Sequence, residues 1–338
     1  MQTNHPDWTE GIIQVVTNVN NRDVYDRLKE TLNFFGFITN LSIYNYDGKG
    51  SVSSPYLKEN NFIIASGEAD GDAMKQALAG CKSASDRTPN IQTIILQPGT
   101  NFDKNFYIYF LNKLEPPFNG EGFQNLLSIR LQMLRDKGDP YKKPDYAVYR
   151  SMIMEIDFES PCKYYAYFKT QLEDIEENGG GEKQYEALAS QMLNYLDESG
   201  GTHVKAEFLL GQILDFGLRN YSQAVKAYTG VLKYITANAN FYYFLAAAYL
   251  KLKNALSYEN EIVSNLTKAI QYDKFSYRAY FKFTRLYDMK GDYPRMLEYL
   301  RRVIELLEPV KESYGLTGEE EEFYGCSVRK YNRLLITS

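Results

Sequence analysis

The sequence predicts an α/β plus all-α protein, in which a small N-terminal α/β three-layer domain precedes a domain of stacked helical hairpins. Strand-like apolar runs alternate with helical patterns up to residue 97, and strand patterns disappear after residue 115. The helical phrase "GDYPRMLEYLRRVIELLEP" (291–309) has a looser echo in "RNYSQAVKAYTGVLKY" (219–234). Such an echo indicates repeated supersecondary units. We expect an α/β, Rossmann-like domain over 8–115, a helix and linker over 116–160, and a helical repeat domain over 161–338.

Composition limits the classes of protein. With 44% hydrophobic residues in 338, the chain can bury a core in each of two domains. Its formal net charge of -5 argues against general nucleic-acid binding, which needs clustered cations. The three cysteines are far apart, which disfavours a zinc or redox pair and favours a reducing cytoplasm. Because neither a long apolar run nor a basic start followed by an apolar stretch occurs, we expect no membrane span and no secretory signal.

The N-terminal part alternates between strand and helix patterns. Buried-type strands are expected at 11–19, 37–46, 61–66 and 91–97, with amphipathic helices at 23–36 and 68–81. Strands that alternate with helices predict crossover units and a mainly parallel sheet covered on both faces.

A ligand of such a sheet would lie at the carboxyl ends of the strands. The candidate residues there are Thr17, Ser66, Glu68, Asp70 and Asp72. The three carboxylates resemble the first half of a calcium loop, but the twelfth position holds alanine, so the alternative is that they cap and solvate a helix N-terminus. No glycine-rich phosphate loop, metal-ligand cluster or nucleophile with its base is present in the sequence. We therefore expect no catalytic residue, no metal and no cofactor.

From residue 116 onward the pattern is helical. A helix is expected over 123–138, closed by Gly138, and "DPYKKPDY" (139–146) reads as a linker. Two further helices flank "NGGG" (178–181). The sequence leaves open whether residues 161–197 form a further repeat.

The three later units align with one another at matching large and small positions. Leu232, Ile270 and Ile304 occupy equivalent places, at steps of 38 and 34 residues, so the middle unit carries a longer loop within "KLKNALSY" (251–258). In the last unit the matching positions are Tyr280, Phe283, Tyr287, Gly291, Tyr293, Leu300, Val303, Ile304 and Pro309. Over about residues 204–309 the chain resembles the tetratricopeptide repeat, whose period is about 34 residues. "TGEEEEFYGCSVRKYNRLL" (317–335) is expected to cap the array, with Thr317 as N-cap, Glu320 completing a capping box and its glutamates solvated.

The resemblance implies that the concave face, lined by the first helix of each hairpin, binds a protein or peptide. Three cations of the last unit, Arg278, Lys282 and Arg285, share one helical stripe at spacings of four and three residues. Such a stripe suits carboxylates, and the alternative is an ordinary solvated face. In family members that clamp a terminal carboxylate, basic residues stand where Arg278 and Lys282 stand here. The other clamp positions are replaced, for example by Phe244. The expected partner-binding residues are Arg278, Lys282, Arg285, Phe281, Tyr243, Phe244 and Asn240.

Two functional hypotheses follow. We expect a non-enzymatic scaffold or adaptor that binds a partner, with acidic character, through the helical array. The alternative is a sensor or enzyme whose N-terminal domain binds a nucleotide-like small molecule while the repeats recruit a partner. The sequence leaves open the partner, the pathway and self-association.

Overall fold

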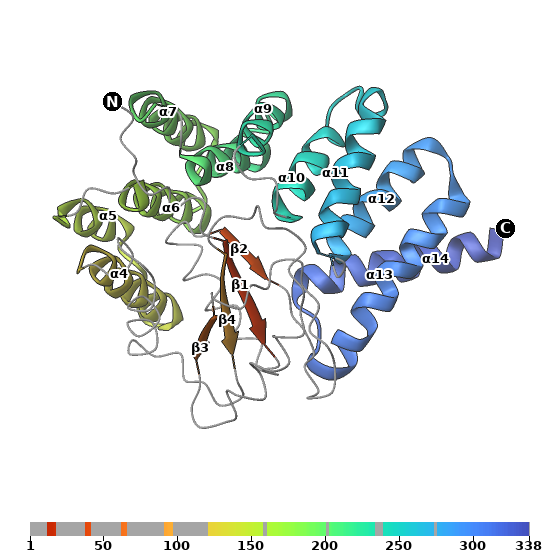
Figure 1. Ribbon diagram of the computed structural model, residues 1–338, viewed down its shortest axis with the longest axis horizontal. Coiled ribbons are helices and arrows are strands. Elements are labelled where there is room, and N and C mark those ends of the chain that lie inside the picture. The colour runs from red at the N-terminus through yellow and green to blue at the C-terminus, as the bar shows by residue number, and fades with distance from the viewer. Residues whose placement is uncertain are drawn as a thin grey trace. The chain divides into compact units, whose positions relative to one another are not determined.

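The structure is a computed structural model that describes residues 12–17, 38–41, 62–65, 91–96, 121–157, 161–200, 203–233, 239–273 and 276–337 (Figure 1). Contacts divide the chain into two compact units, Met1–Ile213 and Leu214–Ser338. Each unit is described by itself. Among the described residues, no helix is both long and apolar enough to cross a bilayer.

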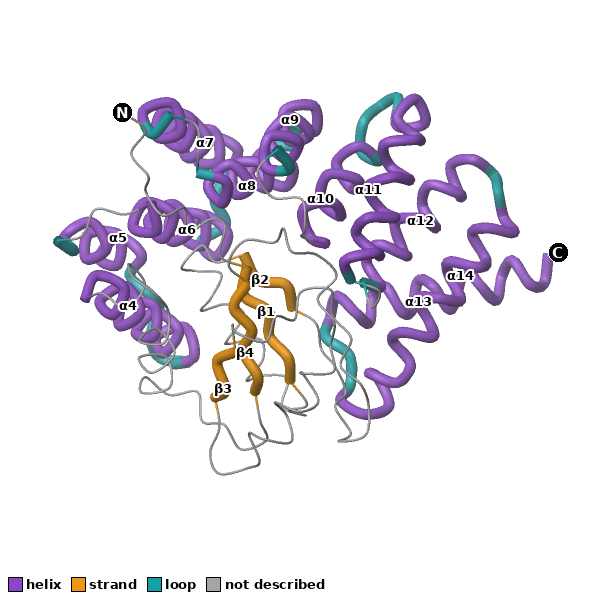
Figure 2. The backbone as a smooth tube through the Cα atoms, in the orientation of Figure 1, coloured by secondary structure: helices purple, strands orange, loops and turns teal. Residues whose placement is uncertain are grey.

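The N-terminal strands form a parallel sheet. β1 (Ile12–Thr17), β2 (Ile38–Leu41), β3 (Phe62–Ala65) and β4 (Ile91–Leu96) are arranged in the order β2-β1-β4-β3 (Figure 2). Thr17 and Ala65 are both in register with Leu96, so three strands end at the same edge. Each strand lies within its predicted range. The helices predicted at 23–36 and 68–81 lie outside the described residues, and the three-layer α/β domain therefore stays a prediction.

The helical part of the first unit begins with α4 (Glu121–Gly138), which ends at the predicted glycine. The segment that the sequence predicts as linker contains a further helix, α5 (Tyr146–Glu155). The Asp145 carboxylate caps this helix by accepting a hydrogen bond from the Val148 N–H at 3.2 Å. The two prolines before Asp145 suggested a linker, but they stand outside the helix and do not interrupt it.

Three more helices complete the first unit: α6 (Pro161–Glu177), α7 (Glu182–Glu198) and α8 (Val204–Gln212). α6 and α7 pack against each other and flank the predicted glycine turn. Within this turn Gly179 has φ +68°, and a Cβ on Gly180 would stand 2.6 Å from Ile175 Cγ2. The glycines are therefore needed for the turn to bring the two helices together.

The second unit is a helical array in which successive helices pack against each other. A five-residue π-helix ending in this unit, Ile213–Gly217, precedes α9 (Tyr221–Val231). Two hairpins and a final helix follow: α10 (Ala239–Tyr249) with α11 (Glu259–Tyr272), α12 (Tyr277–Lys290) with α13 (Tyr293–Tyr314), and α14 (Gly318–Thr337). The longer loop predicted in the middle unit is present and contains the short 3-10 helix Ala255–Tyr258.

Apolar positions at helical spacing form the core of the array. Leu266 of α11, Leu286 of α12 and Leu300 of α13 are fully buried in one cluster. Gly291 ends α12 at φ +69°, and Asp292 caps α13 by accepting from the Arg295 N–H at 3.2 Å. These are the turn residues that open the repeated phrase, so the sequence signal has a direct structural cause. Pro309 does not end α13, which continues to Tyr314.

Helix α14 caps the array in the predicted manner. The Thr317 N–H donates to Glu320 Oε2 at 3.0 Å, and the Phe323 ring contacts Tyr277 and Phe281 of α12. The prediction that all its first glutamates are solvated is wrong for Glu320, which is only 6% exposed. Its capping contact accounts for this burial.

Candidate partner-binding site

The cation stripe predicted on α12 divides into two parts. Arg278 pairs with Glu319 at the start of α14 and is therefore neutralised within the chain. The Phe281 ring centroid lies 4.7 Å from that of Phe323, so α14 covers part of this side chain. Lys282 and Arg285 remain, and neither forms an ion pair with any residue in the part of the chain that the structure describes.

Lys282 lies in an electropositive environment. Its Nζ is 5.9 Å from the Tyr243 ring centroid, which places α10 beside α12 at this point. Burial, together with the charges of Arg285 and Lys251, lowers the pKa of Lys282 to about 8. The side chain is thus largely protonated at neutral pH, but its charge is poorly compensated.

Aromatic side chains adjoin these cations. The Tyr243 and Phe244 ring centroids are 5.2 Å apart, and Phe244 meets Phe216 edge-on at 6.0 Å. Phe216 is 58% exposed, whereas Tyr243 is largely buried in the core of the array. Large exposed aromatics beside cations are typical of protein interfaces.

The π-helix before α9 adds a buried carboxylate. Asp215 is 1% exposed, and its Oδ1 accepts from Lys251 Nζ at 2.6 Å. Lys251 Nζ also lies 4.3 Å from the Phe216 ring centroid. Burial raises the pKa of Asp215 and the positive charge of Lys251 opposes this rise. We call the group formed by Phe216, Phe244, Lys251, Lys282 and Arg285 the α10–α12 surface.

The α10–α12 surface has an excess of positive charge. Within the described part of the second unit, Asp215 is the one carboxylate that forms an ion pair with any of its three cations, and Lys282 feels Asp215 and, more weakly, Glu319. The chain as a whole carries a net charge of -5, so this excess runs against the overall balance. An anionic group would therefore be attracted to this surface.

Of the remaining predicted site residues, the structure describes Asn240 and the backbone of Thr17. Asn240 is exposed at the start of α10. Thr17 ends β1, and its side chain is not described. Ser66, Glu68, Asp70 and Asp72 lie outside the described residues. They stay predictions.

Sequence reasoning missed three residues near the predicted site: Asp215, Phe216 and Lys251. The π-helix changes the helical register, so the period of about 3.6 residues does not indicate which way Asp215 and Phe216 point. Lys251 follows α10 in a turn, beyond the periodic segment. The one sequence feature that could have indicated them is "LDFG" (214–217), in which an aromatic residue directly follows a charged one.

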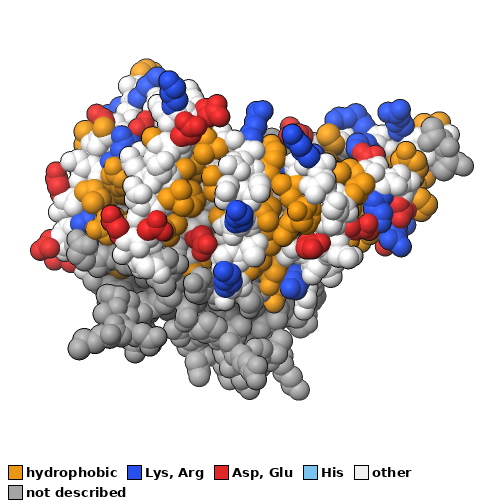
Figure 3. Space-filling model, turned by 90° about the horizontal axis from the view of Figure 1, so that it is seen from above, with side chains coloured by type: hydrophobic (Ala, Val, Ile, Leu, Met, Phe, Trp, Pro, Cys, Tyr) orange, Lys and Arg blue, Asp and Glu red, His pale blue; other side chains and the backbone are white. Residues whose placement is uncertain are grey.

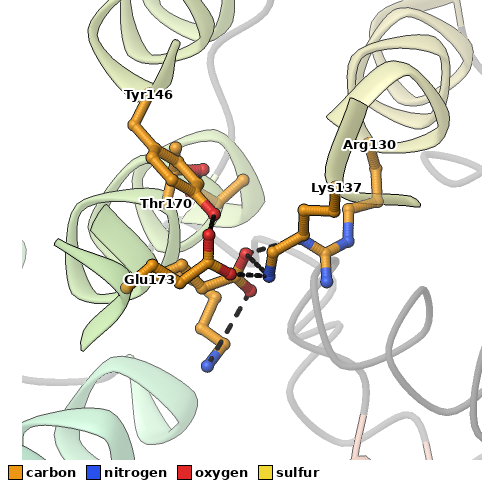
Figure 4. Close-up of polar contacts among 8 residues, drawn as sticks. Arg130, Lys137, Tyr146, Thr170 and Glu173 are labelled. Carbon is orange, nitrogen blue, oxygen red and sulfur yellow. Dashed lines mark hydrogen bonds and ion pairs between the residues drawn. The ribbon is translucent and has the colours of Figure 1, made fainter. Parts of the chain in front are cut away.

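A different polar cluster joins helices of the first unit. Glu173 of α6 is only 6% exposed. Its carboxylate forms ion pairs with Arg130 of α4, Lys137 and Lys169, with N···O distances of 2.9, 3.4 and 4.0 Å (Figure 4). Burial would raise the pKa of Glu173, but the charges of Arg130 and Lys169 together hold it below its ordinary value. Its cations converge on the carboxylate, as Figure 4 shows for Arg130 and Lys137. The cluster therefore joins helices rather than offering an open site.

Exposed hydrophobic side chains occur between charged ones on the face drawn in Figure 3. The large hydrophobic residues at least 40% exposed include Val148, Met152, Met154, Leu193, Phe216, Leu256, Met289 and Tyr293. Both units thus expose apolar area that a partner can cover.

Several solved structures are similar to this chain in fold. MamA residues 41–end from Desulfovibrio magneticus RS-1 is 18% identical, with a TM-score of 0.43 over 56% of this chain and 97% of that one. The TPR2AB domain of yeast Sti1, in a complex with pHSP90, is 17% identical, with a TM-score of 0.30 over 67% and 92% of the two chains. The C-terminal helical part resembles tetratricopeptide repeats. Its hairpins have the glycine turn and the final capping helix that the sequence predicts. No protein-family model and no curated protein sequence matches the chain.

Proposed function

We propose that the second unit is a protein-interaction scaffold whose α10–α12 surface, on the concave face of the array, binds an acidic segment of a partner protein. The observation that supports this most directly is the pair Lys282 and Arg285, which form no ion pair with any described residue and lie on the same surface as the exposed Phe216 ring.

The physical argument begins with the poorly compensated cations. Burying Lys282 without a direct ion pair to any described residue is unfavourable, and a bound anionic group would reduce this penalty. Arg285 is exposed three residues further along the same helix, so a carboxylate near one side chain can also reach the other. A partner carboxylate would thus pair with cations that have no ion pair among the described residues.

Apolar contact adds to this attraction. Phe216 and Phe244 present adjoining rings, and Lys251 lies over the first of them. A leucine or aromatic side chain of the partner can pack on Phe216 while its acidic neighbour binds the cations. We therefore expect the partner segment to combine carboxylates with large apolar residues.

The test uses the intact chain and a Lys282→Glu, Arg285→Glu variant. A Lys226→Glu, Arg301→Glu variant is the matched control because it makes the same charge change at exposed sites on the second helices α9 and α13. Proteins captured from the source cells are identified by mass spectrometry, and circular dichroism verifies folding. We also measure binding of an acidic probe, a labelled peptide with glutamates and leucines, by fluorescence anisotropy.

We expect one set of proteins and the acidic probe to bind the intact chain and the control, and to be lost from the Lys282→Glu, Arg285→Glu variant. Double charge reversal should weaken probe binding at least tenfold. If the folded variant captures the same proteins and binds the probe equally well, the α10–α12 surface is an ordinary solvated face and the proposal is wrong.

The alternative function, a small-molecule sensor in the N-terminal region, has one supporting observation. Thr17 and Ala65 share a register with Leu96, so the carboxyl ends of β1, β3 and β4 occur together. Ligands of parallel sheets bind at such ends. Mass spectrometry of small molecules released from the purified chain tests it. A retained nucleotide that a Thr17→Val variant loses would favour the sensor, whereas no retained nucleotide would count against it.

A further inference from the structure

A groove in the first unit is lined by helices α5, α6 and α7 and has a volume of about 390 Å³. Its aromatic residues include Tyr164 and Tyr167 of α6 and Tyr195 of α7. The Tyr164 and Tyr195 rings stack with centroids 4.9 Å apart. The groove therefore offers a rigid aromatic surface, since stacked rings hold each other in place.

The second feature of the groove is a row of polar groups along α7. Gln191, Asn194 and Glu198 line it and are exposed. Their side chains, and the Tyr167 and Tyr195 hydroxyls, make no hydrogen bond to other residues within the described part of the chain. The amides and hydroxyls are thus free to donate to a ligand.

These donors distinguish between the forms that a bound peptide can take. A helical peptide satisfies its own backbone carbonyls and would leave the donors unused. An extended strand binds by pairing with a sheet edge, but the groove has helical walls. A polyproline II segment has no internal hydrogen bonds, so its carbonyls need donors, and its proline rings pack on aromatic residues.

The dimensions of α7 agree with one turn of such a segment. Gln191 and Glu198 are seven residues apart on the helix, or about 10.5 Å at the usual rise. One polyproline II turn of three residues extends about 9.3 Å. A polyproline II segment lying along α7 would therefore present the same side to Gln191 and, about one turn later, to Glu198.

The Glu198 carboxylate favours a ligand with a positive charge at its end of the groove. It is the one charged residue among those that line the groove, and it forms no ion pair with the residues that the structure describes. We propose that the α5–α7 groove binds a proline-rich segment of a partner protein in the polyproline II conformation, with a lysine or arginine of that segment at Glu198. This site goes beyond the proposed role of the second unit, because it uses different residues and takes a ligand of opposite charge.

The experiment measures binding of three labelled, end-blocked peptides to the full chain by fluorescence anisotropy. One contains prolines and two arginines, the second replaces the arginines by glutamates, and the third is an alanine-rich helical peptide with the same two arginines. The test variant is Gln191→Ala, Asn194→Ala, which removes the donors but retains a helix-favouring residue at each position. An Asn260→Ala, Gln271→Ala variant makes the same changes at exposed positions of α11.

We expect the proline–arginine peptide to bind at least fivefold more tightly than either other peptide. Binding should weaken at least fivefold in the Gln191→Ala, Asn194→Ala variant and stay unchanged in the α11 control. A Glu198→Lys variant should reverse the preference between the arginine and glutamate peptides. Absence of binding, equal binding of the helical peptide, or full binding by the Gln191→Ala, Asn194→Ala variant would each overturn the proposal.

Discussion

The Glu173 cluster of the first unit and the α10–α12 surface of the second use charge in opposite ways. At Glu173, Arg130 and Lys169 pair with one buried carboxylate, while Lys137 pairs with that carboxylate and also with Glu177 at 2.5 Å. At the α10–α12 surface, three cations meet one buried carboxylate, Asp215, which pairs directly only with Lys251. The first arrangement depresses a carboxylate pKa and the second depresses a lysine pKa. Charge that is compensated internally joins helices, whereas charge without an ion pair at an accessible surface attracts groups of opposite charge.

The largest expected effect is the loss of Glu173. Glu173→Gln removes the negative charge that compensates Arg130, which is only 2% exposed. We expect the free energy of unfolding to fall by about 3–5 kcal/mol, measured by urea denaturation followed by circular dichroism. A Glu186→Gln variant, which makes the same change at an exposed site of α7, should lose less than about 0.5 kcal/mol.

A double variant sharpens this result. Arg130→Met with Glu173→Leu should recover much of the loss because it removes the buried charges together. If Glu173→Gln and Glu186→Gln reduce stability equally, the Glu173 cluster does not hold the helices together and the contrast between the two regions fails.

Lys205 tests whether an uncompensated cation always indicates a binding surface. It is 6% exposed in α8, its Nζ lies 5.9 Å from the Tyr165 ring centroid, and it has no carboxylate partner among the described residues. Burial, and then the charge of Lys169, lowers its pKa to about 7. Since this cation is inaccessible, we expect it only to destabilise the fold. Lys205→Met should raise the free energy of unfolding by about 1–3 kcal/mol at pH 6.5.

The pH dependence provides the control for Lys205. Between pH 7 and its ordinary pKa near 10.5, the unfolded chain holds the Lys205 proton and the folded chain does not. Stability therefore rises with pH across this window. Urea denaturation at pH 6.5 and 9 should show the rise in the intact chain and a smaller one in Lys205→Met. An identical rise in both chains would mean that Lys205 is not the titrating group.

The lowered pKa of Lys282 predicts a second pH effect, on the affinity of the α10–α12 surface for the acidic probe. With a pKa of about 8, Lys282 loses its charge in the unbound chain as pH rises from 7 to 9. Affinity for the acidic probe should consequently fall by up to about tenfold over this range. Fluorescence anisotropy checks this, with Lys282→Arg as the variant that keeps its charge. A fall of the same size in Lys282→Arg would assign the pH effect to another group.

Sequence patterns predicted the periodic parts of the fold and not the contacts between them. Gly291 and Asp292 indicated a turn because their roles depend on local backbone geometry. The cap at Thr317 was predictable for the same reason. The pair between Arg278 and Glu319 joins residues 41 apart in the sequence, so no local pattern could indicate that α14 neutralises part of the predicted stripe. The stripe itself was predictable, but which of its cations form no ion pair with the described residues was not.

The smallest expected effect concerns this Arg278–Glu319 pair, which marks the boundary between compensated and uncompensated charge on α12. Both side chains are partly exposed, at 31% and 45%, so breaking the pair should reduce stability by less than about 1 kcal/mol. Glu319→Gln frees Arg278 to join Lys282 and Arg285, and we expect affinity for the acidic probe to rise by about two- to threefold. Glu321→Gln, in the same first turn of α14, is the matched control and should leave affinity nearly unchanged. A rise in both variants would reflect overall charge, whereas a rise in Glu319→Gln alone means that α14 limits the binding surface by pairing with one of its cations.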